Sequence, residues 1–160
     1  MHIRPGLLPG LVPLVLLLLL SGCARGTAIE APPARSLQAA MAPPPDGMCD
    51  NDSPRTNPSM QPPAFVQGNR QGLRDLQSRF RIPDEAQAAS DQIGSGRILV
   101  QYTVGTDGAV YGMQVTSEPY GYGLEAAAMA AVAPSRYIPG RMDGEPVCVK
   151  MNLPFDFRLR

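Results

Sequence analysis

Apolar and polar residues alternate along the C-terminal stretch of the chain, from Val147 to Leu159. The apolar positions are Val147, Val149, Met151, Leu153, Phe155, Phe157 and Leu159, and the positions between them are Cys148, Lys150, Asn152, Pro154, Asp156 and Arg158. A period of two places successive side chains on opposite faces of a β-strand, one face buried and the other in contact with water. The pattern therefore predicts a long C-terminal strand.

Two earlier runs with the same period predict a β-hairpin. The second run extends from Val110 to Ser117, and the apolar positions of the first are Ile98, Val100, Tyr102 and Val104. Thr106-Asp107-Gly108 supplies the turn between them, because glycine tolerates the positive φ angle that such a turn requires. The alternation of the second run breaks once, which is typical of a β-bulge.

Helical spacing marks three other segments. Leu73, Leu76 and Phe80 lie on one side of a first helix, and a short second helix begins at Pro83. The third is an alanine-rich helix over Leu124–Ala133, which Pro134 ends. Its small side chains allow this helix to lie close to a sheet.

Four arginines lie mostly on the other faces of the first predicted helix: Arg70, Arg74, Arg79 and Arg81. We interpret them as a solvent-exposed face. The alternative is a basic stripe for anionic lipid or for a partner.

The order of these elements predicts an α+β fold of the type β-β-α-β, in which a three-stranded antiparallel sheet packs against helices. The helical connection returns the last strand beside the first, because such connections are short and right-handed. The expected order is therefore second, first, third, with the last strand at an edge. Pro154 agrees with an edge position, where its missing N–H breaks no ladder.

Proline is frequent in the N-terminal half of the chain. Nine of the eighteen prolines fall between residues 24 and 64, and few large apolar residues accompany them. Such a segment cannot bury enough surface to offset the entropy of ordering it. We therefore expect residues 23–64 to form an extended or disordered tether, and residues 65–160 to form the domain.

The first 22 residues have the pattern of a secretory signal peptide. A leucine run from Leu14 to Leu20 follows the basic residue Arg4. The sequence Leu20-Ser21-Gly22-Cys23 resembles the lipobox of bacterial lipoproteins. This resemblance implies cleavage before Cys23 and diacylation of its thiol.

An uncleaved membrane helix is the alternative for this segment. A spanning helix needs about 20 apolar residues, whereas the stretch from Leu7 to Leu20 is shorter and contains Pro9 and Pro13. Ala24 stands where inner-membrane lipoproteins carry a retaining aspartate, so we expect a lipid anchor on the periplasmic face of the outer membrane.

Composition argues against several classes of function. The chain carries 14 basic and 14 acidic residues, a balance that gives no support for nucleic-acid binding. The single histidine, His2, lies within the signal peptide. A mature chain without histidine cannot build a serine or cysteine triad of the usual kind or a typical zinc site. We therefore expect no enzymatic activity, no metal and no cofactor.

Two cysteines remain once Cys23 is acylated, and they are candidates for one disulfide in an oxidising compartment. A bond between Cys49 and Cys148 would close a loop of about 100 residues, worth at most about 4–5 kcal/mol in the chain-entropy model. The alternative is two unpaired thiols.

Six segments resemble the TonB C-terminal domain family in their order and spacing: Ile82–Ala86, Gly96–Val104, Asp107–Val110, Leu124–Ala127, Arg136–Gly140 and Pro154–Phe157. The resemblance covers about residues 80–160 and implies a fold that agrees with the one above. It also implies a non-enzymatic protein. One departure is Ser135, which follows Pro134 where family members commonly carry an aromatic residue, so we expect the helix to end early.

The family resemblance implies a way of binding. TonB itself is anchored in the inner membrane and coupled to the ion-driven ExbB–ExbD motor, and it grips an extended segment of outer-membrane receptors as a strand beside its own final strand. An exposed strand edge suits this mode, because backbone hydrogen bonds supply affinity and side-chain pockets supply selectivity.

The leading hypothesis is a lipid-anchored periplasmic protein-binding module, linked to transport across the outer membrane. Its partner would be a TonB-dependent receptor or another envelope protein. The candidate binding residues on the edge strand are Val149, Lys150, Met151, Asn152 and Arg158. The three polar residues of this set, Lys150, Asn152 and Arg158, fit an ordinary solvent-facing strand surface equally well.

Two other functions remain open. An uncleaved N-terminal membrane helix would favour a motor-coupled energy transducer. A structural envelope lipoprotein, dimerising through its exposed edge, is the second alternative, because edge strands readily pair with themselves.

Overall fold

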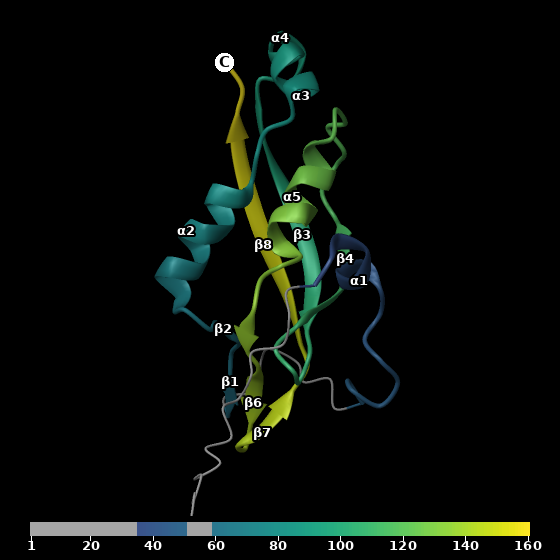
Figure 1. The fold of residues 1–160 in the computed structure, drawn as a ribbon, viewed down its shortest axis with the longest axis vertical. Helices are drawn as coiled ribbons and strands as arrows, with labels where there is room; N and C mark the ends of the chain where they lie inside the picture. The colour runs from purple at the N-terminus through teal and green to yellow at the C-terminus, as the bar shows by residue number, and fades with distance from the viewer. Residues whose placement is uncertain (1–34, 51–58) are drawn as a thin grey trace, which may run out of the picture. The chain divides into compact units, whose positions relative to one another are not determined.

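The computed structural model of the chain describes residues 35–50 and 59–160 (Figure 1). The predicted signal peptide, the lipobox Leu20-Ser21-Gly22 and the lipidation site Cys23 lie outside the described residues.

The central element is a three-stranded antiparallel sheet with the order β4-β3-β8. Its strands are β3 (Ser95–Val104), β4 (Val110–Val115) and β8 (Val149–Arg158). The second, first and third strands of the predicted motif therefore lie in the predicted order, with the last strand at an edge (Figure 1). The family-type fold expected from the sequence is confirmed.

The hairpin between β3 and β4 closes through a network around its turn. The Gly105 N–H donates to the Ala109 carbonyl at 2.9 Å, and Oδ1 of Asp107 accepts from the Ala109 N–H at 2.9 Å. The pairing of the two strands shifts register between Gln101 and Thr103. The shift confirms the predicted irregularity in this hairpin.

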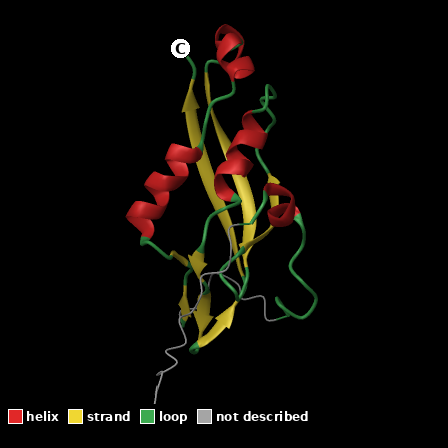
Figure 2. Cartoon of the chain, in the orientation of Figure 1, coloured by secondary structure: helices red, strands yellow, loops and turns green. Residues whose placement is uncertain are grey.

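Helices cover one face of the sheet (Figure 2). They are α2 (Asn69–Arg79) and α5 (Leu124–Val132), and two short helices, α3 (Asp84–Ala88) and α4 (Ser90–Ile93), lie at the end of the sheet where β3 begins (Figure 1). The sequence predicted all of these except α4. The helix α5 ends at Val132, one residue before the predicted end at Ala133.

The core lies between this helical layer and the sheet. Buried side chains from β3, β8, α2 and α5 form one cluster, which includes Ile98, Val100, Tyr102, Val104, Phe155, Phe157, Leu76, Leu124, Ala128 and Val132. Even-numbered residues of β3 and odd-numbered residues of β8 therefore face the helices, as the alternation predicted.

The tether expected over residues 23–64 differs from the structure where the structure describes it. Helix α1 (Leu37–Met41) begins at Ser36, whose Oγ accepts from the Ala39 N–H at 3.2 Å. Ala40 is fully buried and belongs to the core. This single apolar turn is ordered because it packs against β4. Amino-acid composition does not reveal a tertiary contact of this kind.

The domain also begins before the expected boundary at Phe65. β1 (Met60–Gln61) pairs with β6 (Gly140–Met142), which forms a hairpin with β7 (Glu145–Val147). β2 (Ala64–Phe65) pairs with β5 (Tyr137–Ile138). Two short ribbons thus join residues 60–65 to the segment between α5 and β8.

The structure contains the disulfide predicted between Cys49 and Cys148, across a sequence separation of 99 residues. Cys148 is buried rather than wet, and it separates β7 from β8. The long strand predicted from Val147 to Leu159 is therefore interrupted after its first residue.

Candidate functional site

The candidate site is the outer edge of β8. This strand pairs with β3 over ten consecutive residues, from Val149 opposite Val104 to Arg158 opposite Ser95. The register shows no shift along its length. Within the described ranges, β8 has no second strand neighbour.

The hydrogen bonds of Leu99 establish which backbone groups of β8 point outward. The Leu99 N–H donates to Ser117 Oγ at 3.2 Å, and its carbonyl accepts from the Thr116 N–H at 2.9 Å. Both groups therefore face β4 and not β8. Pro154 is the β8 residue opposite Leu99, so its backbone points to the open edge.

The same alternation assigns the other positions. Asn152, Asp156 and Arg158 share the parity of Pro154, so their N–H and C=O groups also point outward. None of these outward backbone groups has a hydrogen-bond partner in the part of the chain that the structure describes. The edge thus offers backbone donors on both sides of Pro154, and Pro154 itself contributes only its carbonyl.

An apolar groove lies along this edge, between β8 and α2. It has a volume of about 270 Å³ and is lined by Leu73, Leu76, Gln77, Phe80, Leu153, Pro154, Phe155 and Asp156. The Phe80 and Phe155 rings lie 5.1 Å apart and join its two walls. Leu73 is 42% exposed, so part of its side chain is accessible at the groove.

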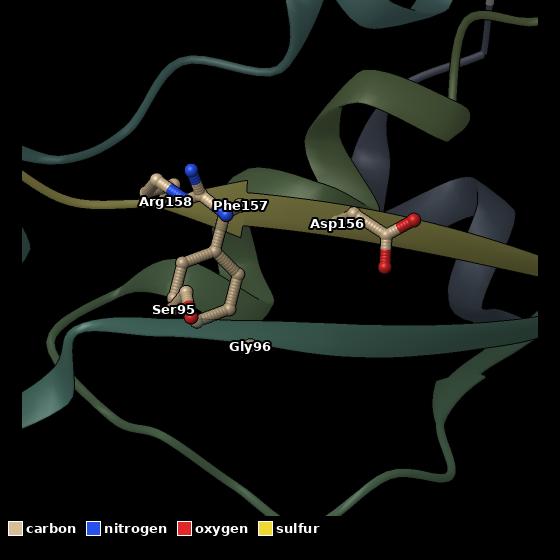
Figure 3. Close-up of a pocket in the computed structure, with 5 residues that line it drawn as sticks. All are labelled: Ser95, Gly96, Asp156, Phe157 and Arg158. Atoms are coloured by element: carbon tan, nitrogen blue, oxygen red, sulfur yellow. The ribbon is translucent and has the colours of Figure 1, made fainter.

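A second hollow of about 360 Å³ lies where β3 begins and β8 ends (Figure 3). Its lining residues are Ser95 and Gly96 of β3 and Asp156, Phe157 and Arg158 of β8. Tyr120 packs edge-on against Phe157, with ring centroids 4.9 Å apart. Asp156 lines both hollows, but the second hollow lies over the paired ends of β3 and β8 and not along the outer edge of β8.

The face of the sheet opposite the helices is polar at this edge. Arg97 and Asp156 form an exposed ion pair, in which Nε and Nη2 of Arg97 donate to the two carboxylate oxygens at 2.6 and 3.2 Å. The hydrogen bond from Arg97, together with its charge, lowers the pKa of Asp156 below its ordinary value. The carboxylate is therefore compensated within the chain.

The predicted binding residues separate into two groups. Lys150, Asn152 and Arg158 are exposed on the polar face of β8. Met151 is partly buried on the helical face. Val149 is 1% exposed, so its side chain is not available on the surface of the strand. Its side chain packs close to Gly140 of β6, and the ribbon that buries it was not foreseen.

Sequence reasoning missed the α2 wall of the groove. The sequence predicted one apolar stripe on this helix, formed by Leu73, Leu76 and Phe80. The helical spacing of such a stripe is the same whether its side chains are fully buried or line a groove. The partly exposed Leu73 distinguishes the two cases, and exposure follows only from the fold.

The other edge of the sheet, along β4, is covered by the chain itself. The Gly112 N–H of β4 donates to the Ala42 carbonyl at 2.8 Å. The guanidinium carbon of Arg35 lies 4.0 Å from the centre of the Tyr111 ring. We call residues 35–50 the clasp. The clasp closes one edge of the sheet and leaves β8 as the open one.

Within residues 35–50 and 59–160, the structure contains no cluster of potential metal ligands and no helix suited to spanning a membrane. No group of three or more His, Cys, Asp or Glu residues there has the arrangement of a metal site. Over the same residues, no helix combines the length and the apolar character needed to span a bilayer.

These features define the class of the domain: an α+β module with one open strand edge beside an apolar groove. Residues 83–159 match the sequence model of the family described as Gram-negative bacterial TonB protein C-terminal. TonB C-terminal domains are non-enzymatic protein-interaction modules of the periplasmic envelope.

Among solved structures, the chain is similar to the NMR solution structure of the Helicobacter pylori TonB C-terminal domain. The identity is 21% and the TM-score 0.41, over 57% of this chain and 79% of that chain. No curated protein matches the chain. The clasp and α2 both precede the residues that the family model matches.

Proposed function

We propose that this protein binds an extended segment of another envelope protein as an additional strand along β8. The observation that carries the proposal is the open, ten-residue edge of β8 beside an apolar groove. Backbone groups of the edge would supply affinity, and the groove would accept apolar side chains of the docked segment.

The geometry of a docked strand supports this assignment. In an antiparallel pair, residues directly opposite each other point to the same face of the sheet. Partner residues opposite Leu153 and Phe155 would therefore point into the groove. Partner residues opposite Asn152 and Asp156 would lie on the polar face. An alternating apolar and polar segment fits both surfaces at once.

The partner class that we propose is a TonB-dependent receptor, or another envelope protein with an exposed extended segment. Synthetic peptides from the N-terminal regions of such receptors are suitable probes. We expect at least one to bind the full chain with a dissociation constant below the high micromolar range. Absence of binding across the panel at that concentration would contradict strand addition.

A variant in the groove tests where such a peptide binds. Leu73→Glu places a carboxylate in the apolar wall, and burial of a leucine-sized group contributes about 1.5–3 kcal/mol. We therefore expect a loss of affinity of about tenfold or more. Val66→Glu is the matched control, because Val66 is 55% exposed and does not line the groove. Equal affinities of the two variants would place the peptide elsewhere.

We also propose that a lipid on Cys23 anchors the protein to the periplasmic face of the outer membrane. The sequence Leu20-Ser21-Gly22-Cys23 after a leucine run supports this anchor, and Ala24 supports the outer membrane. The mass of the mature N-terminus tests it. A diacylated Cys23 is the expected result, whereas an intact Met1 would instead support a motor-coupled transducer with a membrane helix.

A further inference from the structure

A chain of three amide side chains crosses the polar face of the sheet and ends at the open edge. Nε2 of Gln114 on β4 donates to Oε1 of Gln101 on β3 at 3.1 Å. Nε2 of Gln101 in turn donates to Oδ1 of Asn152 on β8 at 3.0 Å. The three residues stand directly opposite one another in the register of the sheet. We call this arrangement the amide ladder.

The amide ladder orients the side chain of Asn152. An asparagine amide carries one acceptor oxygen and two N–H donors. Because the oxygen faces Gln101, the Nδ2 group of the same planar amide points away from Gln101, on a strand whose other side is open. Asn152 is exposed, and Nδ2 has no acceptor among the residues that the structure describes. The edge therefore presents a side-chain donor at a fixed position.

The carboxylate of Asp156 lies near Asn152 on the same strand, but it is already engaged by another residue. Both oxygens of Asp156 accept hydrogen bonds from Arg97, and the two residues form an ion pair. Pro154, between Asn152 and Asp156, has no polar side-chain atom. Along this part of the edge, a docked strand therefore meets a side-chain amide donor, and the nearest side-chain acceptor, Asp156, is already paired with Arg97.

We propose that Asn152 is a specificity-determining residue, which selects extended segments carrying a side-chain acceptor at the position opposite it. The acceptor is the amide or carboxylate oxygen of Gln, Asn, Glu or Asp. This inference rests on the proposed strand addition along β8. Directly opposite residues have Cβ atoms about 4.5–5.5 Å apart, so their side chains can hydrogen-bond. An aliphatic residue there would cover the Asn152 donors without replacing their bonds to water.

Selection from a peptide library tests the proposal even while the natural partner is unidentified. A phage-displayed library of random ten-residue segments is panned in parallel on the full wild-type chain and on Asn152→Asp. The substitution is isosteric and exposed, and it keeps an oxygen for Gln101. Wild-type binders are expected to share an alternating apolar pattern with Gln, Asn, Glu or Asp enriched at one polar position. Asn152→Asp binders should keep the apolar pattern and carry Lys or Arg at that position.

Affinities of one selected peptide make the test quantitative. We expect its acceptor residue, when replaced by Met, to cost about 2- to 10-fold in affinity for the wild type, the range of one neutral hydrogen bond. The same replacement should cost nothing for Asn152→Asp. Identical enrichment and identical ratios for both proteins would overturn the role of Asn152 and leave strand addition standing. Failure to select any β8-dependent binder, judged by Leu73→Glu, would overturn both.

Discussion

Gly108 and Gly144 both adopt the left-handed backbone conformation, with φ angles of +75° and +90°, but their surroundings differ. A Cβ atom on Gly108 would lie far inside van der Waals contact with the Tyr137 carbonyl oxygen, whereas a Cβ on Gly144 would meet nothing within 4 Å. The Gly108 carbonyl also accepts from the Tyr137 N–H at 3.0 Å. The hairpin turn and β5 are therefore held together at a position that only glycine fits.

Alanine substitutions at these two glycines separate the free-energy cost of a positive φ angle from the cost of a steric clash. We expect Gly144→Ala to lower the free energy of unfolding by about 1 kcal/mol, for the positive φ alone. Gly108→Ala should cost about 2–4 kcal/mol, because backbone must also move. Urea unfolding of both variants measures the difference. Equal losses would show that β5 yields easily to the added methyl group.

At this scale the sequence predicted the Asp107-Gly108 turn correctly, because local chemistry specifies it. The contact with Tyr137 was not predictable, since the two residues are brought together by the fold alone. The same reason explains why Asn152 was predicted to be exposed while its bond to Gln101 was not.

At the scale of elements, Arg79 connects the ends of α2 and α5. Its Nε donates to the Ala131 carbonyl, in the last turn of α5, at 2.9 Å, and its Nη2 donates to Ser135 Oγ at 2.9 Å. Ser135 is 3% exposed. The sequence indicated a solvent-exposed arginine at position 79 and a departure from the family pattern at Ser135. In the structure, each of these two residues supplies the other with a partner, which a helical period cannot reveal.

The arginine can be tested against a neighbour on the same helix. Arg79→Met leaves the Ser135 hydroxyl and a carbonyl of α5 without their donor, and we expect a loss of about 1–3 kcal/mol in unfolding free energy. Arg74→Met should change it by less than about 0.5 kcal/mol, because Arg74 is exposed. Thermal and urea unfolding of the two variants provide the comparison. A loss no larger than that of Arg74→Met would show that solvent replaces the bonds of Arg79 at little cost.

At the scale of the whole molecule, the two edges of the main sheet differ within the described residues. The β4 edge is covered by the clasp, and the β8 edge stays open beside α2. Proteins commonly blunt exposed edges to prevent unwanted pairing. Covering one edge restricts strand addition to the other. Composition predicted a disordered segment where the clasp lies, because the proline content masked one apolar turn, Leu37–Met41, that packs on β4.

The Cys49–Cys148 disulfide holds the clasp to the start of β8, so its removal tests whether the β4 edge depends on it. In Cys49→Ala/Cys148→Ala we expect a loss of at most about 4–5 kcal/mol in unfolding free energy, the limit for a loop of this length. The sharper readout is amide hydrogen exchange at Gly112, whose N–H donates to Ala42. Exchange there should accelerate in the double variant, because the clasp is then held only by α1 and its neighbouring contacts.

Two other amides serve as internal controls for that measurement. The outward-facing amide of Asn152 should exchange rapidly in both proteins, and the Val100 amide, inside the sheet, should report global unfolding alone. Faster exchange at Gly112 than at Val100 would show that the clasp opens before the sheet does. If Gly112 instead stays as protected as Val100 in the double variant, packing of Ala40 suffices to hold the clasp, and the disulfide is not what closes this edge.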